Sequence, residues 1–134
     1  MSAAGKYSEK LPCGGTLEIT TDSFHIQYYF PGTDARYNGT FVEVPGSQLE
    51  VYIDAFKDNW RTFQDLRAKL PAQGEYQQAG RHGMQIRIGT FNEGVCIQSH
   101  HMLFRTESGL QGVIESYRYA IRRATEVQAL LRQL

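Results

Sequence analysis

Apolar and polar residues alternate in several short stretches of the first half of the chain, which is the pattern of β-strands that bury one face. The clearest stretch is 24–30, with the sequence FHIQYYF. Shorter alternating stretches at 16–20 and 40–44 predict two further strands. Pro31-Gly32 suits the middle of a turn after 24–30, because proline fixes φ and glycine accepts a positive φ.

The segment that follows this turn allows two ways of pairing the strands. In one, 24–30 pairs directly with 40–44. In the other, Ala35–Tyr37 forms a separate short strand that is closed by a turn at Asn38-Gly39, a dipeptide typical of tight hairpins. The alternation is compatible with both, so the strand order stays open at this point.

The second half of the chain contains a second hairpin pattern. Alternation predicts a strand at 84–90 and a return strand at 95–104. A two-residue loop at Glu93-Gly94 keeps the apolar side of this hairpin apolar, and it places Arg87 opposite His100 on the polar side.

Two segments have the three- and four-residue spacing of apolar positions that is typical of amphipathic helices. The first begins at a capping-box pattern, Ser47-Gln48-Leu49-Glu50, and ends before Pro71. The second begins near Ser108 and continues to the end of the chain. Between them, the segment 71–83 (PAQGEYQQAGRHG) reads as a polar loop.

These elements follow one another in the order β-β-β-α-β-β-α, which indicates an α+β fold. Hairpins favour an antiparallel sheet, here of about five strands, with both amphipathic helices packed on one face. The chain has no repeat and no linker-like stretch, so residues 1–134 are expected to form a single domain. Because residues 1–14 contain glycine and proline and show no apolar pattern, we expect them to be poorly ordered.

Composition narrows the possible partners. The chain of 134 residues has 14 Lys+Arg against 14 Asp+Glu, so its formal net charge is zero. This balance argues against a general nucleic-acid binder, which needs an excess of basic residues to contact phosphates. The first 15 residues (MSAAGKYSEKLPCGG) hold no apolar stretch typical of a signal peptide, and no run approaches a membrane span. We therefore expect a cytoplasmic protein with no membrane partner.

The polar side of the predicted sheet is the candidate functional face. It has few lysines and glutamates, whereas tyrosine, arginine and histidine, which are enriched in interface hot spots, are present. The loop before the second hairpin contains the basic pair Arg81-His82. We add this pair to the candidate face because loops on a rigid scaffold often carry function. The residues expected to bind a protein partner are Tyr29, Glu43, Arg81, His82, Arg87, Gln98 and His100.

Catalytic and metal-binding signatures are scarce. The chain contains no G-x-S-x-G, no phosphate-binding G-x-x-x-x-G-K-[ST], no G-x-G-x-x-G and no H-E-x-x-H. The adjacent His100 and His101 would point to opposite faces of a strand, so they do not form a shared metal site. We expect no metal and no cofactor. A small enzyme using His100, Arg87 and Glu43 on the polar face is a weaker alternative.

In size, architecture and lack of catalytic motifs, the chain resembles small bacterial immunity proteins, which neutralise antibacterial toxins. The resemblance implies an antitoxin that occludes the active site of a cognate toxin with a preformed surface. The strand and helix order is also similar to that of type III secretion chaperones, which are homodimers that bind an extended effector segment. Those chaperones begin with an amphipathic helix and are usually acidic, whereas this chain has Gly5, Pro12, Gly14 and Gly15 near its start and no net charge.

Overall fold

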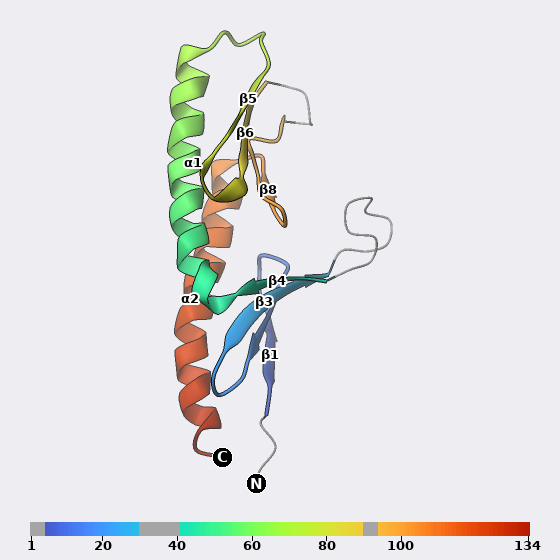
Figure 1. Cartoon of the computed structure of the whole chain (residues 1–134), viewed down its shortest axis with the longest axis vertical. Coiled ribbons are helices and arrows are strands. Elements are labelled where there is room, and N and C mark those ends of the chain that lie inside the picture. The colour runs from blue at the N-terminus through green and yellow to red at the C-terminus, as the bar shows by residue number, and fades with distance from the viewer. Residues whose placement is uncertain (1–4, 30–40, 90–93) are drawn as a thin grey trace. The chain divides into compact units, whose positions relative to one another are not determined.

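The computed structural model describes residues 5–29, 41–89 and 94–134 and shows an α+β fold (Figure 1). The described strands form two antiparallel sheets of four strands each, so the expected single sheet of about five strands is wrong. The chain divides into two compact units: the first contains Met1–Glu50 and Glu115–Leu134, and the second contains Val51–Ile114. Whether these units make up one domain, as expected, stays a prediction.

Sheet 1 lies in the first unit and confirms the strands expected there. Each of its strands pairs with the next, and β3 pairs directly with β4, which selects the first of the two pairings that the sequence allowed. The expected turn at Pro31-Gly32 and the alternative strand Ala35–Tyr37 lie outside the described residues. The strands of sheet 1 are β1 (Tyr7–Lys10), β2 (Thr16–Ile19), β3 (Phe24–Tyr29) and β4 (Phe41–Pro45).

Strand β1 corrects the expectation that residues 1–14 are poorly ordered. It pairs along its length with β2, and its two inward side chains are held by helix α2 (Glu107–Leu131). Tyr119 donates a hydrogen bond to Glu9, and Arg123 Nε donates another to Glu9 Oε1 at 3.1 Å. Arg123 also donates to the hydroxyl of Tyr7 at 3.2 Å. These contacts between β1 and α2 are polar hydrogen bonds, so the pattern of apolar residues does not indicate them.

The apolar side of sheet 1 packs against the part of α2 that belongs to the first unit. The hydroxyls of Tyr28 and Tyr117 lie 3.1 Å apart in this interior, where they form a buried hydrogen bond. Gly15 is needed in the β1–β2 turn, because a Cβ there would lie 2.5 Å from Ile26. The fully buried side chains of this core include Leu17, Ile19, Ile26, Val44 and Tyr117.

Helix α1 (Leu49–Lys69) supplies the core of the second unit. It confirms the first predicted helix, although the chain enters through a 3-10 turn, η1 (Gly46–Gln48), so Ser47 is not the N-cap. Phe56 of α1 packs edge-on against Phe104, with ring centroids 5.0 Å apart. The second predicted helix is also confirmed, and Thr106 caps it by accepting a hydrogen bond from the Gly109 N–H.

Sheet 2 lies in the second unit, where Figure 1 shows it beside α1. Its first strand falls within the segment expected to be a polar loop. That segment carries no apolar alternation, because the strand is an exposed edge whose order comes from backbone pairing with its neighbour. The elements of this sheet are β5 (Tyr76–Ala79), the 3-10 turn η2 (Arg81–Gly83), β6 (Gln85–Ile88), β7 (Ile97–Gln98) and β8 (Leu103–Phe104).

The expected return strand at 95–104 is two short strands joined by a turn. The turn is made by Ser99, whose backbone N–H donates to the Met102 carbonyl at 2.8 Å and whose hydroxyl accepts from the Met102 N–H at 3.0 Å. A serine hydroxyl can bond to the backbone in place of a neighbouring strand and so close a turn. The apolar and polar residues continue to alternate through this turn, so the sequence pattern does not reveal it. His100 therefore lies in a turn, and the prediction that it sits opposite Arg87 on a strand is wrong.

The register of this hairpin also differs from the expected one. The Arg87 N–H bonds to the carbonyl of Cys96 at 2.8 Å, and Gln85 pairs with Gln98. Because the shift from the expected register is an even number of residues, Arg87 and Gln98 still share the polar side of the sheet. The sequence thus predicted the faces of Arg87 and Gln98 correctly and the pairing incorrectly. In β8 the expected faces are wrong as well, because Leu103 pairs with Gln98 and the buried Phe104 pairs with Ile97.

Candidate protein-binding site

The residues expected to form one binding face lie on different parts of the fold. Tyr29 and Glu43 are on sheet 1 of the first unit. Arg87 and Gln98 are on sheet 2 of the second unit. The remaining three are not on strands: Arg81 and His82 form η2, and His100 lies in the turn between β7 and β8.

The outer face of sheet 1 is the side opposite its buried core. Its residues face one another across β2, β3 and β4, and they include Thr16, Glu18, His25, Gln27, Tyr29, Phe41 and Glu43. His25 Nε2 lies 2.8 Å from Glu18 Oε1 and 3.6 Å from Glu43 Oε1. Lys6 Nζ contacts the other oxygen of Glu18 at 3.2 Å. Burial raises the pKa of Glu18, but Lys6 and His25 outweigh it, so the pKa lies below its usual value.

Two aromatic rings stand exposed on this outer face. Tyr29 and Phe41 are directly paired across β3 and β4, and their ring centroids lie 4.9 Å apart. Tyr29 is 57% exposed and Phe41 is 60% exposed, so both are more exposed than Tyr76, at 40%, on the edge of sheet 2. They border a shallow hollow of about 280 Å³ that extends over the β1–β2 turn. Large apolar side chains that remain together in solvent are typical of binding surfaces.

The polar side of sheet 2 is organised around a single arginine. Arg87 on β6 donates hydrogen bonds to Gln98 on β7 and, at 3.4 Å, to Gln77 on β5. Its guanidinium is therefore held between amide groups from both neighbouring strands. This arrangement brings together Arg87 and Gln98, two of the expected binding residues, and adds Gln77, which sequence patterning had placed in a loop.

A buried asparagine fixes the loop that presents Arg81 and His82. Asn59 of α1 is 1% exposed, accepts from the Arg81 N–H at 2.8 Å and donates to the Arg81 carbonyl at 3.1 Å. Gly80 is required beside this clamp, because a Cβ there would lie 2.6 Å from the Asn59 oxygen. His82 adopts the left-handed region with φ 57, which is uncommon for a residue other than glycine and often marks a functional segment.

Three histidines gather around Tyr52 of α1. The Tyr52 ring packs edge-on against His82, with centroids 4.5 Å apart, and against His101 at 5.0 Å. His100 and His101 are 5.3 Å apart. Burial lowers the pKa of His101 to about 4, and the nearby His100 and His82 add to the effect. The structure thus brings His82, from the loop where it was expected, into one cluster with His100, which lies in a turn and not on the sheet face.

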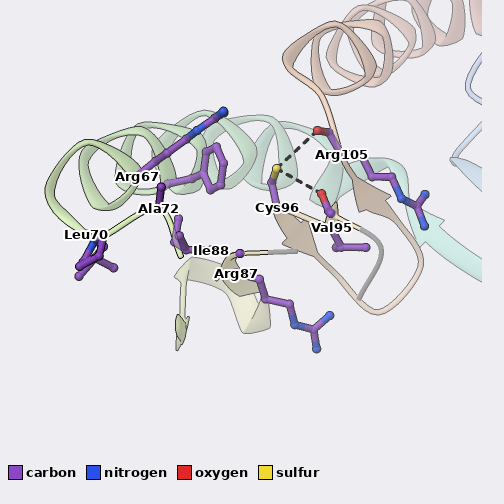
Figure 2. Close-up of a pocket in the computed structure, with 12 residues that line it drawn as sticks. Arg67, Leu70, Ala72, Arg87, Ile88, Val95, Cys96 and Arg105 are labelled. Atoms are coloured by element: carbon purple, nitrogen blue, oxygen red, sulfur yellow. Dashed lines mark hydrogen bonds between the residues drawn. The ribbon is translucent and has the colours of Figure 1, made fainter. Parts of the chain in front are cut away.

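The second unit also contains a pocket of about 400 Å³ that sequence patterning did not indicate. Figure 2 shows Arg67, Arg87 and Arg105 around it, with Cys96 near its centre. The Cys96 thiol donates to the carbonyls of Gly94 at 3.6 Å and Arg105 at 3.5 Å, and burial raises its pKa. Arg67 comes from a helix and Arg105 from the segment after β8, so neither belongs to the alternating pattern from which the binding face was inferred.

Metal sites, membrane-spanning helices and similarity to known proteins are three further indicators of function. Among the described residues, no group of three or more His, Cys, Asp or Glu side chains is placed to hold a metal ion. No described helix combines the length and apolar character that crossing a membrane requires. Comparison with protein-family models, curated proteins and solved structures found no match.

Proposed function

We propose that this chain is a cytoplasmic protein-binding module that inhibits a cognate partner, in the manner of bacterial immunity proteins, and that it has no catalytic activity of its own. The observation that supports this best is the exposed Tyr29–Phe41 pair on the outer face of sheet 1. Tyrosine and other aromatic side chains supply a large share of binding energy at protein interfaces, because they bury a wide area with few rotatable bonds.

The surroundings of this pair suit a preformed interface. Contacts of Glu18 with His25 and Lys6 connect neighbouring parts of the same face, farther along the sheet from the rings. Glu18 has two partners within the face, so docking need not leave its carboxylate buried and unpaired. Hot spots are typically ringed by polar contacts of this kind, which exclude water without contributing much energy themselves.

Inhibition would follow from steric occlusion. A partner that buries the two rings would have its own surface covered by the outer face of sheet 1, and an active site at that surface would lose access to its substrate. The zero net charge of the chain fits recognition by shape and aromatic contact rather than by a long-range field.

The proposal requires that a toxin be encoded beside this gene, and the test is protection from that toxin. Cells that co-express the toxin domain with the wild-type chain should grow, whereas the Tyr29→Ala, Phe41→Ala double variant should fail to protect them. Leu130→Ala is the matched control, because Leu130 is also a large apolar side chain of the first unit and is 58% exposed. Protection by the double variant equal to that by wild type would contradict the proposal.

The two other functions give different outcomes in the purified protein. A secretion-chaperone-like function requires a stable homodimer that binds an extended segment, whereas the proposal requires a one-to-one complex with a folded domain. An enzyme would turn over a substrate and lose that activity on substitution of His100, Arg87 or Glu43. Light scattering of the chain alone and with its partner separates the first two.

A further inference from the structure

The arginine-lined pocket of the second unit combines an apolar interior with a basic surround. We propose that it takes an acidic segment of the protein partner, with one large apolar side chain seated in the pocket and carboxylates against the arginines around it. This inference rests on the proposed function, because it identifies the chemistry of a second part of the same partner.

The interior of the pocket suits an apolar anchor. Its lining includes the large apolar side chains Phe63, Leu70, Ile88 and Val95. A cavity of about 400 Å³ falls in the range that holds a small ligand or a large side chain. Interface anchors are typically aromatic or aliphatic groups that fill a pocket of this kind and are surrounded by polar contacts.

The charge around the pocket points to an acidic partner. Arg67, Arg87 and Arg105 line it, and no carboxylate occurs among its lining residues within 41–89 and 94–134. Arg87 is bonded to two neutral amides and Arg67 lies over the Phe63 ring, so neither contact offsets the positive charge that these two side chains bring to the pocket. Arginine also binds carboxylates in a planar, two-bonded geometry that lysine does not offer.

The spread of the arginines favours an extended segment over a single small anion. In Figure 2 the side chains of Arg67, Arg87 and Arg105 leave the pocket in different directions, so their charged ends lie apart from one another. Arg87 is also held in place by Gln77 and Gln98. One small anion would meet one guanidinium, whereas carboxylates on either side of an anchored side chain can reach more than one.

A neighbouring hollow contains an intrinsic reporter of binding. Trp60 lines it together with Phe63 and Arg67, which also line the pocket. The rings of Trp60 and Phe63 have centroids 4.9 Å apart. Trp60 is the single tryptophan of the chain, so its fluorescence reports on this region alone.

The experiment is a fluorescence titration of the full-length chain with a short synthetic peptide that has a central phenylalanine flanked by glutamates. We expect saturable binding, at least about tenfold weaker when the phenylalanine is replaced by glycine or the glutamates by lysine. Arg67→Glu should weaken binding by a similar factor. Arg118→Glu is the control, because Arg118 is exposed on α2, does not line the pocket and should leave affinity unchanged.

Three results would overturn the inference. They are no saturable change in fluorescence, equal weakening by Arg118→Glu, and equally tight binding of a naphthalene carboxylate, which would indicate a small-molecule site. If the peptide does not bind but the Tyr29→Ala, Phe41→Ala variant loses protection, the proposed acidic segment is wrong and the proposed function stands. If the peptide binds but the double variant still protects, the proposed function is wrong instead.

Discussion

The two sheets of this protein have the same strand order, but their polar sides are built from different chemistry. On sheet 1, His25 contacts Glu18 across neighbouring strands, and two aromatic rings stand in solvent farther along the same face. On sheet 2, Arg87 is held between neutral amides, and no aromatic ring accompanies it among the strand residues of that side that the structure describes.

The interiors differ in a parallel way. The first unit contains a buried hydroxyl pair, Tyr28 and Tyr117, whereas the second contains a buried amide, Asn59, and a buried imidazole, His101. The amide does not hold two core elements together but fixes an exposed loop. The comparison teaches that similar sheets can be specialised by a few polar side chains, with one unit presenting a surface and the other presenting a loop and a pocket.

The largest expected effect on stability concerns the hydrogen bonds by which Asn59 holds the Arg81 backbone in the second unit. Asn59→Ala removes both hydrogen bonds to the Arg81 backbone and leaves a cavity, so we expect a loss of about 3 kcal/mol in the free energy of unfolding. Urea denaturation measures it. The exposed Gln64 on the same helix supplies the control, since Gln64→Ala should cost less than about 0.5 kcal/mol. Equal losses in the two variants would show that the clamp does not stabilise the loop.

The second prediction separates the units by their response to acid. The pKa of His101 is lowered from 6.5 to about 4, so the unfolded chain binds more protons than the folded chain in that interval. Stability therefore falls as the pH drops below 6.5, by about 2 kcal/mol between pH 7 and pH 5. The pKa values of Glu9 and Glu18 in the first unit lie below 4.5, so their contribution is lost only at lower pH.

Denaturation at several pH values, for wild type and His101→Gln, measures this difference. The variant should show a flatter dependence between pH 7 and pH 5, because the buried imidazole that resists protonation is gone. Burial has the largest effect on His101, and the groups that face it include the imidazoles of His100 and His82 and the Tyr52 ring. A pH dependence that is the same in both proteins would assign the acid response to other groups.

The third prediction concerns the buried hydroxyl pair of the first unit. Tyr117→Phe removes one partner of Tyr28 while keeping the ring, so we expect a loss of about 1 kcal/mol in the free energy of unfolding. The loss is smaller than for Asn59→Ala because the Tyr28 hydroxyl keeps a contact with the Cys13 sulfur at 3.5 Å. A thermal unfolding curve measures it, and a loss as large as that of Asn59→Ala would mean that the two units do not differ in this respect.

The smallest effect is expected for the ion pairs on the outer face of sheet 1. Glu18→Gln should change the free energy of unfolding by less than about 1 kcal/mol, since ion pairs close to solvent contribute little. The same measurement in high salt should reduce the difference further. A loss above about 2 kcal/mol would show that these charges stabilise the sheet instead of only ordering its surface.

The faces of the fold could be predicted from the sequence because side-chain alternation is a local property. The stretch 24–30 predicted β3, and even the incorrect register of the second hairpin left Arg87 and Gln98 on one side. The two long helices were indicated by their apolar spacing, and each begins within two residues of the expected position.

What the sequence did not predict depends on single polar contacts. Strand β1 is held by Tyr119 and Arg123, which lie far along the chain, and the turn at Ser99 depends on one hydroxyl. The edge strands β1 and β5 have no apolar face that patterning could reveal. The split into two sheets reflects the absence of pairing between β4 and any described strand of the second sheet, which alternation alone does not indicate. Residues expected on one sheet face, such as Glu43 and Arg87, are therefore divided between two sheets.

The measurement that tests the central claim most directly is the affinity of the purified chain for its partner, by isothermal titration calorimetry, with Tyr29→Ala, Phe41→Ala compared with Leu130→Ala. If the outer face of sheet 1 binds the partner, the double variant should bind at least about a hundredfold more weakly, a loss of about 3 kcal/mol, at unchanged unfolding temperature. The control should bind like wild type. Unchanged affinity in the double variant, or equal weakening in both, would contradict the claim that these two rings form the binding site.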